Sequence, residues 1–353
     1  SSKSMEFEDF IYAKEKEKKN KRYEVSQNYW GEMLNDIADA PNIIDSDATS
    51  NENLHFRRLE YFVDKNHWSQ IKNKLNEHKI SPSMGALAAY CAVMGYWSNQ
   101  EKFTINSPIM SYFKRKKEYA EVLGDFTEAL LVPAEKYNTN EEFISYIKRI
   151  SNSFVNSYRH NAFDGIDVMN LLRNNRGERV VMPIVFTSML VKEQSFSNME
   201  RFGKVQYGVS QTPQVYLDCQ LMEREGRLSI TWDYVDKLFD EKKISRMFSQ
   251  FVDIIKRLSS DDIIVNDILS VDDEEKQKLI AYNSTYEERS KMNIGELLGK
   301  SFTDFRDKIA VSDEEKRLTY GELDKLSTRV AAMMKEKGIG SQQRVGIVCD
   351  RTV

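Results

Sequence analysis

The chain has 353 residues, of which 41% are hydrophobic and 30% are charged, values typical of a globular protein. Its 51 Lys and Arg nearly balance its 55 Asp and Glu, giving a net charge of −4, so neither a nucleic-acid surface nor a basic lipid-binding cluster is expected. The length predicts about two domains.

The cysteines, histidines and apolar runs exclude further classes of protein. Three widely separated cysteines predict no disulfide framework and no CxxC zinc pair, and four histidines show no HExxH or HxH spacing. The N-terminus has no signal-peptide core. The uncharged run 80–100 has an apolar centre only at 86–97, which is shorter than the ~20 residues of a membrane span. We therefore expect a cytoplasmic protein that binds no metal, membrane or nucleic acid.

Apolar periodicity predicts alternating strands and helices, and hence an α/β class with a mixed sheet. A solvated, charged helix is expected at 11–24 and continues through 29–34, before an irregular crossing loop at 39–53. The elements that follow are, in chain order, a strand at 56–64, a helix at 66–77, a buried helix from Ser81 to Trp97, strands at 103–110 and 128–133, helices at 138–158 and 167–173, a strand at 179–190, a β-hairpin of strands 215–223 and 227–234, and a helix at 240–258.

The composition changes near residue 259. Residues 259–290 are charged and polar with little apolar periodicity, which predicts an interdomain linker or a short docked segment. A second α/β pattern follows, with helices at 294–306 and 318–339 and strands at 309–312 and 344–349. About 60 residues cannot bury both faces of a sheet, so this second domain is expected to be truncated.

Polar residues within apolar strands are the candidates for function, because burial of a polar group requires a partner. The sequence contains no GxSxG, P-loop or GxGxxG motif. Thr187 and Ser188 end an apolar strand, where they either serve chemistry or bond to strand-end backbone groups. Asp218 lies among apolar neighbours and is either functional or on an outward-facing polar side. Asp125 is either functional or a turn residue, and Gln211 and Gln214 flank a proline in a polar loop.

At these positions the chain resembles the heterocyclization domains of nonribosomal peptide synthetases, a branch of the condensation-domain family. LGDFTEALL (123–131) is similar to the GDFT motif of that branch, and MPIVFTSML (182–190) to its PVVFTS motif. SQTPQVYLDCQLMEREGRLSITWDY (210–234) resembles QTPQVxLDHQ with its trailing residues, and 56–97 resembles a weaker R…W…L…P motif. NSTYEER (283–289) and LTYGEL (318–323) resemble the linker and the first core motif of an adenylation domain.

The chain departs from that pattern in three ways. Cys219 replaces the usual His next to Asp218, and Ile184 replaces the usual Val. The DxxxxD motif and most of the N-terminal lobe are missing. The resemblance therefore implies a C-terminal lobe with the start of the next domain, which by itself is expected to be inactive. The expected divisions are the lobe-crossing segment (1–55), the C-terminal lobe (56–260), the linker (261–292) and the adenylation fragment (293–353).

The resemblance implies a fold like that of chloramphenicol acetyltransferase, with a tunnel between two lobes. Upstream and downstream peptidyl carrier proteins would deliver thioesters on phosphopantetheine arms. Carrier-bound Cys, Ser or Thr would form an amide with the upstream acyl group, and its side chain would then close a thiazoline or oxazoline with loss of water. No bound cofactor is implied, although the adjacent adenylation domain would use ATP and Mg²⁺.

Residue roles carried over from the family make Asp218 the proton carrier and Thr187 its hydrogen-bonding partner. Ser188, Gln211, Gln214 and Asp125 are expected to line the tunnel or support it. Two alternatives remain open: an ordinary amide-forming condensation domain, and a noncatalytic condensation-like platform that docks carrier proteins.

Overall fold

The computed structural model describes residues 5–45, 55–138, 140–190, 207–260, 263, 265–271, 273–286 and 291–349. The chain divides into two compact units, Ser1–Val271 and Asp272–Val353. Among the described residues, no helix combines the length and the apolar character needed to cross a membrane.

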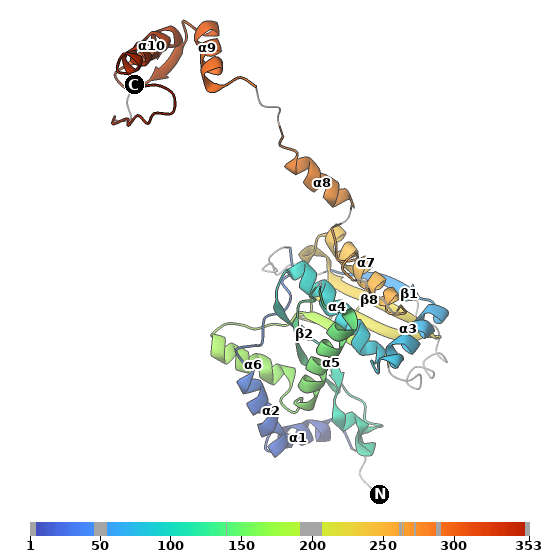
Figure 1. Ribbon diagram of the computed structural model, residues 1–353. Coiled ribbons are helices and arrows are strands. Elements are labelled where there is room, and N and C mark those ends of the chain that lie inside the picture. The colour runs from blue at the N-terminus through green and yellow to red at the C-terminus, as the bar shows by residue number, and fades with distance from the viewer. Residues whose placement is uncertain are drawn as a thin grey trace. The chain divides into compact units, whose positions relative to one another are not determined.

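A six-stranded mixed sheet forms the centre of the first unit (Figure 1). Strand pairing is parallel between β2 and β6 and between β6 and β7, and antiparallel at the other contacts. The α/β class with a mixed sheet is thereby confirmed. In spatial order the strands are β1 (Phe56–Val63), β8 (Arg227–Val235), β7 (Leu217–Arg224), β6 (Ile184–Met189), β2 (Lys102–Asn106) and β5 (Leu131–Glu135).

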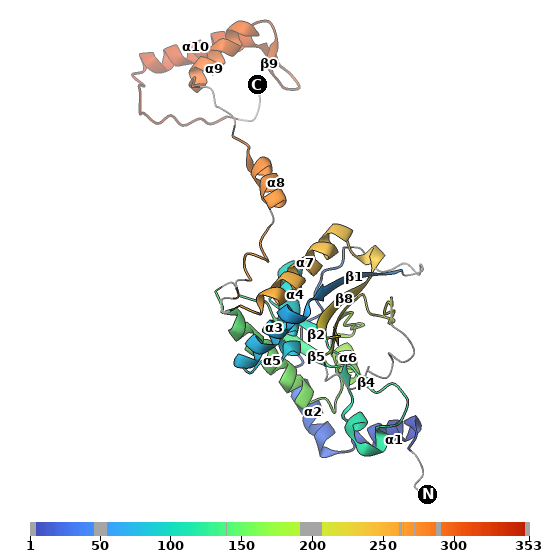
Figure 2. The same cartoon turned by 90° about the vertical axis from the view of Figure 1, so that its right-hand side faces the viewer.

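One face of this sheet is covered by helices, as Figure 2 shows from the side. These helices are α3 (Lys65–Glu77), α4 (Pro82–Ser98), α5 (Phe143–Arg159) and α7 (Glu241–Arg257). Helix α4 begins where Ser81 accepts the backbone N–H of Met84 and where Pro82 occupies the first turn, as the sequence predicts. Its residues Gly85 to Gly95 are all buried, which confirms the buried helix.

Strict alternation along the central strands separates an apolar face from a polar one. In β8 the side chains of Ile230 and Trp232 belong to the core under the helices, and both are fully buried. Thr231 and Asp233 lie on the opposite face. The edge of that opposite face near β5 is covered by α2 (Lys21–Glu32) and α6 (Gly165–Arg176), which form a smaller apolar cluster with Leu131. The polar face of the central strands is where the site lies.

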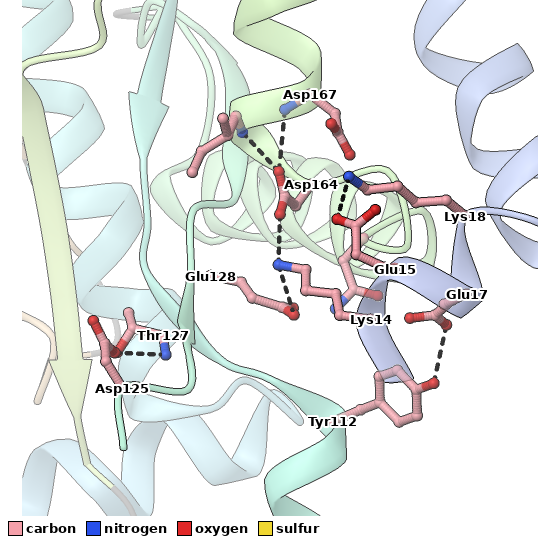
Figure 3. Close-up of polar contacts among 12 residues, drawn as sticks. Lys14, Glu15, Glu17, Lys18, Tyr112, Asp125, Thr127, Glu128, Asp164 and Asp167 are labelled. Atoms are coloured by element: carbon pink, nitrogen blue, oxygen red, sulfur yellow. Dashed lines mark hydrogen bonds and ion pairs between the residues drawn. The ribbon is translucent and has the colours of Figure 1, made fainter. Parts of the chain in front are cut away.

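The predicted continuous helix at 11–34 is wrong, because the chain forms α1 (Phe7–Glu17) and α2 with a break between them. Asn20 adopts an extended conformation at the start of α2, a role that asparagine favours over the helix interior. The prediction that the charged face of this helix is solvated is also wrong. Lys14 contacts the buried carboxylates of Asp164 at 2.8 Å and Glu128 at 3.3 Å (Figure 3), which ties α1 to the rest of the unit.

Two predicted strands are interrupted. The strand expected at 103–110 is β2 followed by the short β3 (Ile109–Met110), and the strand expected at 128–133 is β4 (Thr127–Glu128) followed by β5. Pro108 stands between β2 and β3, where its missing N–H cannot continue a ladder. Strands β3 and β4 pair with each other in a separate two-stranded sheet.

The beginning of the predicted linker packs against the first unit. Val265 is fully buried, and the backbone carbonyl of Ile268 accepts a 2.7 Å hydrogen bond from the side chain of Gln250 in α7. Residues 265–271 therefore behave as the docked segment that was one of the two expectations for this region.

The second unit contains helices and a small antiparallel sheet. Its elements are α8 (Asp273–Asn283), α9 (Ile294–Asp304), β9 (Ile309–Ser312), β10 (Arg317–Thr319) and α10 (Tyr320–Glu336). Helix α8 occupies part of the predicted linker. The strand predicted at 344–349 is wrong: within the described part of the unit it has no pairing partner, and Val348 is fully exposed. A strand requires a neighbour to satisfy its backbone groups, so apolar alternation alone did not suffice.

Gly165 provides a test of how closely α6 packs on the segment before β5. Its N–H donates to the carbonyl of Ala129, and an added Cβ would lie 2.9 Å from that oxygen. We expect Gly165→Ala to lower the free energy of unfolding by about 1–3 kcal/mol, because the backbone would have to shift. Gly31 in α2 has no atom within 4 Å of its added Cβ, so Gly31→Ala should raise stability by up to about 1 kcal/mol.

Tryptophan fluorescence during urea unfolding measures both variants in the first unit alone, since all four tryptophans lie there. A neutral or stabilising Gly165→Ala would contradict the close packing.

Candidate functional site

Three charged residues from neighbouring strands stand side by side on the polar face of the sheet. Asp233 in β8 is paired in register with Arg58 in β1 on one side and with Asp218 in β7 on the other. Val185 in β6 continues the same row beyond Asp218. In the next row Gln220 lies between Thr231 and Thr187. Residues that are up to 175 positions apart in the chain are thus adjacent in the sheet.

Asp218 is held at both carboxyl oxygens. The hydroxyl of Thr187 donates to Oδ1 at 2.9 Å, and the side-chain amide of Gln220 donates to Oδ2 at 2.7 Å. Asp218 is only 8% exposed, so it does not belong to a solvated face. The structure therefore brings together the two residues for which the sequence predicts catalytic roles. Thr187 bonds to a side chain here, which is not the strand-end backbone role of the alternative interpretation.

The pKa of Asp218 is raised above its ordinary value, and burial is the main cause. The hydrogen bonds from Gln220 and Thr187 oppose the rise because they favour the charged form, whereas the negative charge of Asp233 adds to it. A carboxyl with a raised pKa can hold a proton nearer to neutral pH and release it to a leaving group. These electrostatics suit a general acid.

Asp233 is buried more completely and carries a different set of partners. The guanidinium of Arg58 donates two hydrogen bonds of 2.6 Å to its two oxygens, a bidentate arrangement. The backbone N–H of Ser210 donates a third, at 2.7 Å. Hydrogen bonding to Asp233 raises the pKa of Arg58. This ion pair anchors the loop before β7 to the polar face.

Ser188 lies away from Asp218, because successive residues of a strand point to opposite faces. Its hydroxyl is 2.8 Å from that of Ser83, in the first turn of α4. Gln211 and Gln214 are exposed in the loop before β7, and Gln214 has a positive φ of 66°. Neither glutamine bonds to Asp218 within the described part of the chain. Their predicted tunnel-lining or supporting roles stay predictions.

Asp125 lies outside the six-stranded sheet, in the turn before β4. Its carboxylate accepts the backbone N–H of Thr127 at 2.8 Å (Figure 3), and the residue is exposed. This is the geometry of an Asx turn, in which an aspartate replaces a backbone acceptor. The structure thus gives Asp125 the local turn role that was one of its two interpretations.

Cys219, the departure that follows Asp218 in sequence, points to the helix side of the sheet. It is fully buried in the core with Trp232, and burial raises the pKa of its thiol. The replacement of the usual His therefore changes the apolar core and leaves the polar face around Asp218 as it is. Asp218 and Cys219 are therefore neighbours in the sequence, but their side chains lie on opposite faces of the sheet.

Comparison with known proteins identifies the family. Residues 1–280 match the condensation domain family. The chain belongs to this family. Residues 299–353 match the AMP-binding enzyme family, in agreement with the predicted start of an adenylation domain.

This chain spans less than a third of the length of each of three curated relatives that it matches. Bacitracin synthase 1 of Bacillus licheniformis is 29% identical over an alignment of 353 positions that covers 98% of this chain and 7% of the relative. Pyochelin synthetase PchF of Pseudomonas aeruginosa is 28% identical over 255 residues, 72% of this chain and 14% of the relative. Phenyloxazoline synthase MbtB of Mycolicibacterium paratuberculosis is 26% identical over 335 residues, 93% of this chain and 28% of the relative.

Solved structures agree with the fold. The EpoB cyclization-docking bidomain from Sorangium cellulosum has a TM-score of 0.65 and 27% identity, covering 72% of this chain and 52% of that one. The nonribosomal peptide synthetase FmoA3 has a TM-score of 0.81 over 96% of this chain and 36% of its own, and at 23% identity it supports the fold alone. The expected condensation-cyclization fold is confirmed.

Three residues of this site were missed from the sequence alone: Gln220, Asp233 and Arg58. Gln220 was detectable, because it follows Asp218 by two positions and must share its face of β7. Asp233 and Arg58 were not, since their places depend on strand order and register. Within the described ranges, no group of three or more His, Cys, Asp or Glu residues could hold a metal ion.

Burial of Asp218 predicts a pH-dependent cost in stability. Its pKa is raised above the ordinary 3.8. The contribution of Asp218 to the free energy of unfolding therefore decreases as pH rises from 3.8 through the folded-state pKa. Asp218→Asn cannot ionise. We therefore expect the variant to gain free energy of unfolding relative to the wild type from about pH 4 upward, with a plateau once the pH exceeds the folded-state pKa of Asp218.

Urea unfolding followed by tryptophan fluorescence across this range measures the gain. Asp125→Asn makes the same change at an exposed site and should show no comparable gain. A difference between Asp218→Asn and wild type that does not change with pH would contradict the buried, proton-holding carboxyl.

Proposed function

We propose that this chain is part of a nonribosomal peptide synthetase module whose condensation-family domain forms an amide and then cyclizes it. An upstream carrier-bound acyl or peptidyl thioester would condense with carrier-bound Cys, Ser or Thr to give, finally, a thiazoline or oxazoline. The observation that carries the proposal is the hydrogen-bonded pair of Thr187 and Asp218 on a buried polar face. Relatives named for phenyloxazoline synthesis and for cyclization support it.

The second half of the reaction needs acid–base chemistry more than the first. An activated thioester reacts readily with an amine, whereas an amide carbonyl is a poor electrophile and hydroxide a poor leaving group. The side-chain thiol or hydroxyl adds to the amide carbon, its proton is removed, and the former carbonyl oxygen becomes a hydroxyl. Loss of that hydroxyl as water, with loss of the nitrogen proton, forms the C=N bond of the ring.

In this proposal Asp218 moves these protons. As a carboxylate it accepts the proton of the attacking group, and as a carboxylic acid it delivers a proton to the departing hydroxyl. Its raised pKa makes the second role available nearer to neutral pH. The hydroxyl of Thr187 fixes Oδ1 of Asp218, which holds the proton carrier in one orientation.

The partners follow from the same proposal. Peptidyl carrier proteins upstream and downstream would present both substrates on phosphopantetheine arms. The adjoining adenylation domain would load one of those carriers with ATP and Mg²⁺. The finer specificity, Cys against Ser or Thr, would be set with that adenylation domain.

In the complete module, Asp218→Asn should stall the reaction after amide formation, because asparagine keeps the shape and loses the transferable proton. Mass spectrometry of the carrier-bound product should show the uncyclized peptide, heavier than the ring product by one water. Asp253→Asn makes the same change at an exposed position of α7; it is the control and should still cyclize. An ordinary condensation domain would give the open amide in the wild type as well, and a docking platform would form no amide in either protein.

Thr187→Ala should show the same selectivity with a milder loss. The lost hydrogen bond is expected to slow ring closure by the equivalent of about 2.7–4 kcal/mol if it acts on the transition state. Rates of both steps in Thr187→Ala, Asp218→Asn and the double variant form the measurement. The double variant should be scarcely slower than Asp218→Asn, since members of one catalytic unit are not additive. Fully multiplicative losses at unchanged thermal stability would show two independent residues.

A further inference from the structure

The side chain of Gln220 faces two carboxylates at once. Its Nε2 lies 2.7 Å from Oδ2 of Asp218 and 3.3 Å from Oδ2 of Asp233. Carboxylate oxygens accept hydrogen bonds, so the NH2 end of the amide is the only end that satisfies both contacts. The orientation of Gln220 is thus dictated by the two acids, and the amide is the physical link between them.

Asp233 is fixed by donors other than Gln220, namely Arg58 and the backbone N–H of Ser210. Its side chain is completely buried, that of Arg58 is 14% exposed, and the two form the bidentate pair described above. Register pairing places Arg58, Asp233 and Asp218 in one line across three strands. A displacement of Asp233 would therefore change the position of Asp218 through the shared contact with Gln220. It would also change the electrostatic repulsion between the two carboxyl groups.

We infer that Gln220, Asp233 and Arg58 are positioning residues for Asp218: the ion pair fixes the amide, and the amide fixes Oδ2 while Thr187 fixes Oδ1. The inference rests on the proposed function, since it assigns these residues to the acid of the ring-closing step. Each oxygen of Asp218 retains a second lone-pair site, so a proton can be held and transferred without breaking either contact.

The charges of Asp233 and Arg58 affect the protonation of Asp218, an effect that residues with a purely structural role would not have. The groups facing Asp218 are Thr187 in β6, Gln220 in β7, Asp233 in β8 and Arg58 in β1. Glu60 and Tyr207 act more distantly, through Arg58. Asp233 favours the protonated form of Asp218, and Arg58 favours the ionised form. Removing one or the other partner should therefore shift the proton affinity of Asp218 in opposite directions.

The first test measures ring closure against pH in the complete module, starting from the carrier-bound amide. Loss of the hydroxyl from the cyclized adduct needs protonated Asp218, so the rate of this dehydration falls on the alkaline side. Asp233→Asn should move this alkaline limb to lower pH, and Arg58→Gln should move it to higher pH. Arg57→Gln is the matched control on the same strand, because Arg57 pairs with Glu241 at 3.2 Å and is half exposed. Limbs that move in the same direction, or a limb of either variant that stays in place, would overturn the inference.

A second variant guards against loss of folding when the buried ion pair is broken. Gln220→Leu leaves Arg58 and Asp233 paired and removes only the link to Asp218. We expect ring closure to slow about tenfold while amide formation changes less than about twofold. Equal loss of both steps, or full retention of ring closure, would overturn the inference.

The outcomes also separate this inference from the proposed function. If Asp218→Asn loses both steps equally, the proposed function fails. If Asp218→Asn loses only ring closure while Gln220→Leu and Asp233→Asn behave like Arg57→Gln, the proposed function stands and the positioning network is wrong.

Discussion

Two buried carboxylates directly opposite each other across an antiparallel strand pair are the constraint on which the polar face depends. Like charges in that position repel, and burial raises the cost of each charge. The fold accommodates Asp218 and Asp233 at these positions because the two carboxyl groups have different hydrogen-bond donors. Asp233 receives a bidentate guanidinium and a backbone N–H, whereas Asp218 receives only neutral donors. Burial raises the pKa of Asp218, and its neutral donors only partly oppose that rise.

The order of the strands makes this division possible. Because β8 lies between β1 and β7, Asp233 meets a cation on one side and the second acid on the other. On the far face of the same strands, Cys219 and Trp232 pack into the core beneath α4 and α7. Helix packing fixes the strands, the strands fix the register, and the register fixes the distances between the charged groups. The core thus contributes to the site without touching it.

The sequence predicts the strands of this site and two of its residues. It does not predict the contacts that depend on the register between strands. Strands β6, β7 and β8 follow from apolar runs and a hairpin turn, and a family resemblance pointed to Thr187 and Asp218. Arg58 could not be paired with Asp233 in advance, because nothing local relates residues 175 positions apart. The same limit explains why the strand expected at 344–349 is wrong: apolar alternation is local, whereas pairing depends on a neighbouring strand.

The fold alone gives no reason for acids in this row. A buried ion pair is seldom more stabilising than apolar residues of similar volume, and an additional acid with a raised pKa loses stability as pH rises. Val185 occupies the next place in the same row and shows that an apolar residue fits on this face. Positions where a sequence departs from what packing favours, with the carboxyl oxygens of both acids nonetheless partnered, are those where function outweighs stability. In this chain that argument selects Asp218 first, since it is the acid whose environment favours the proton.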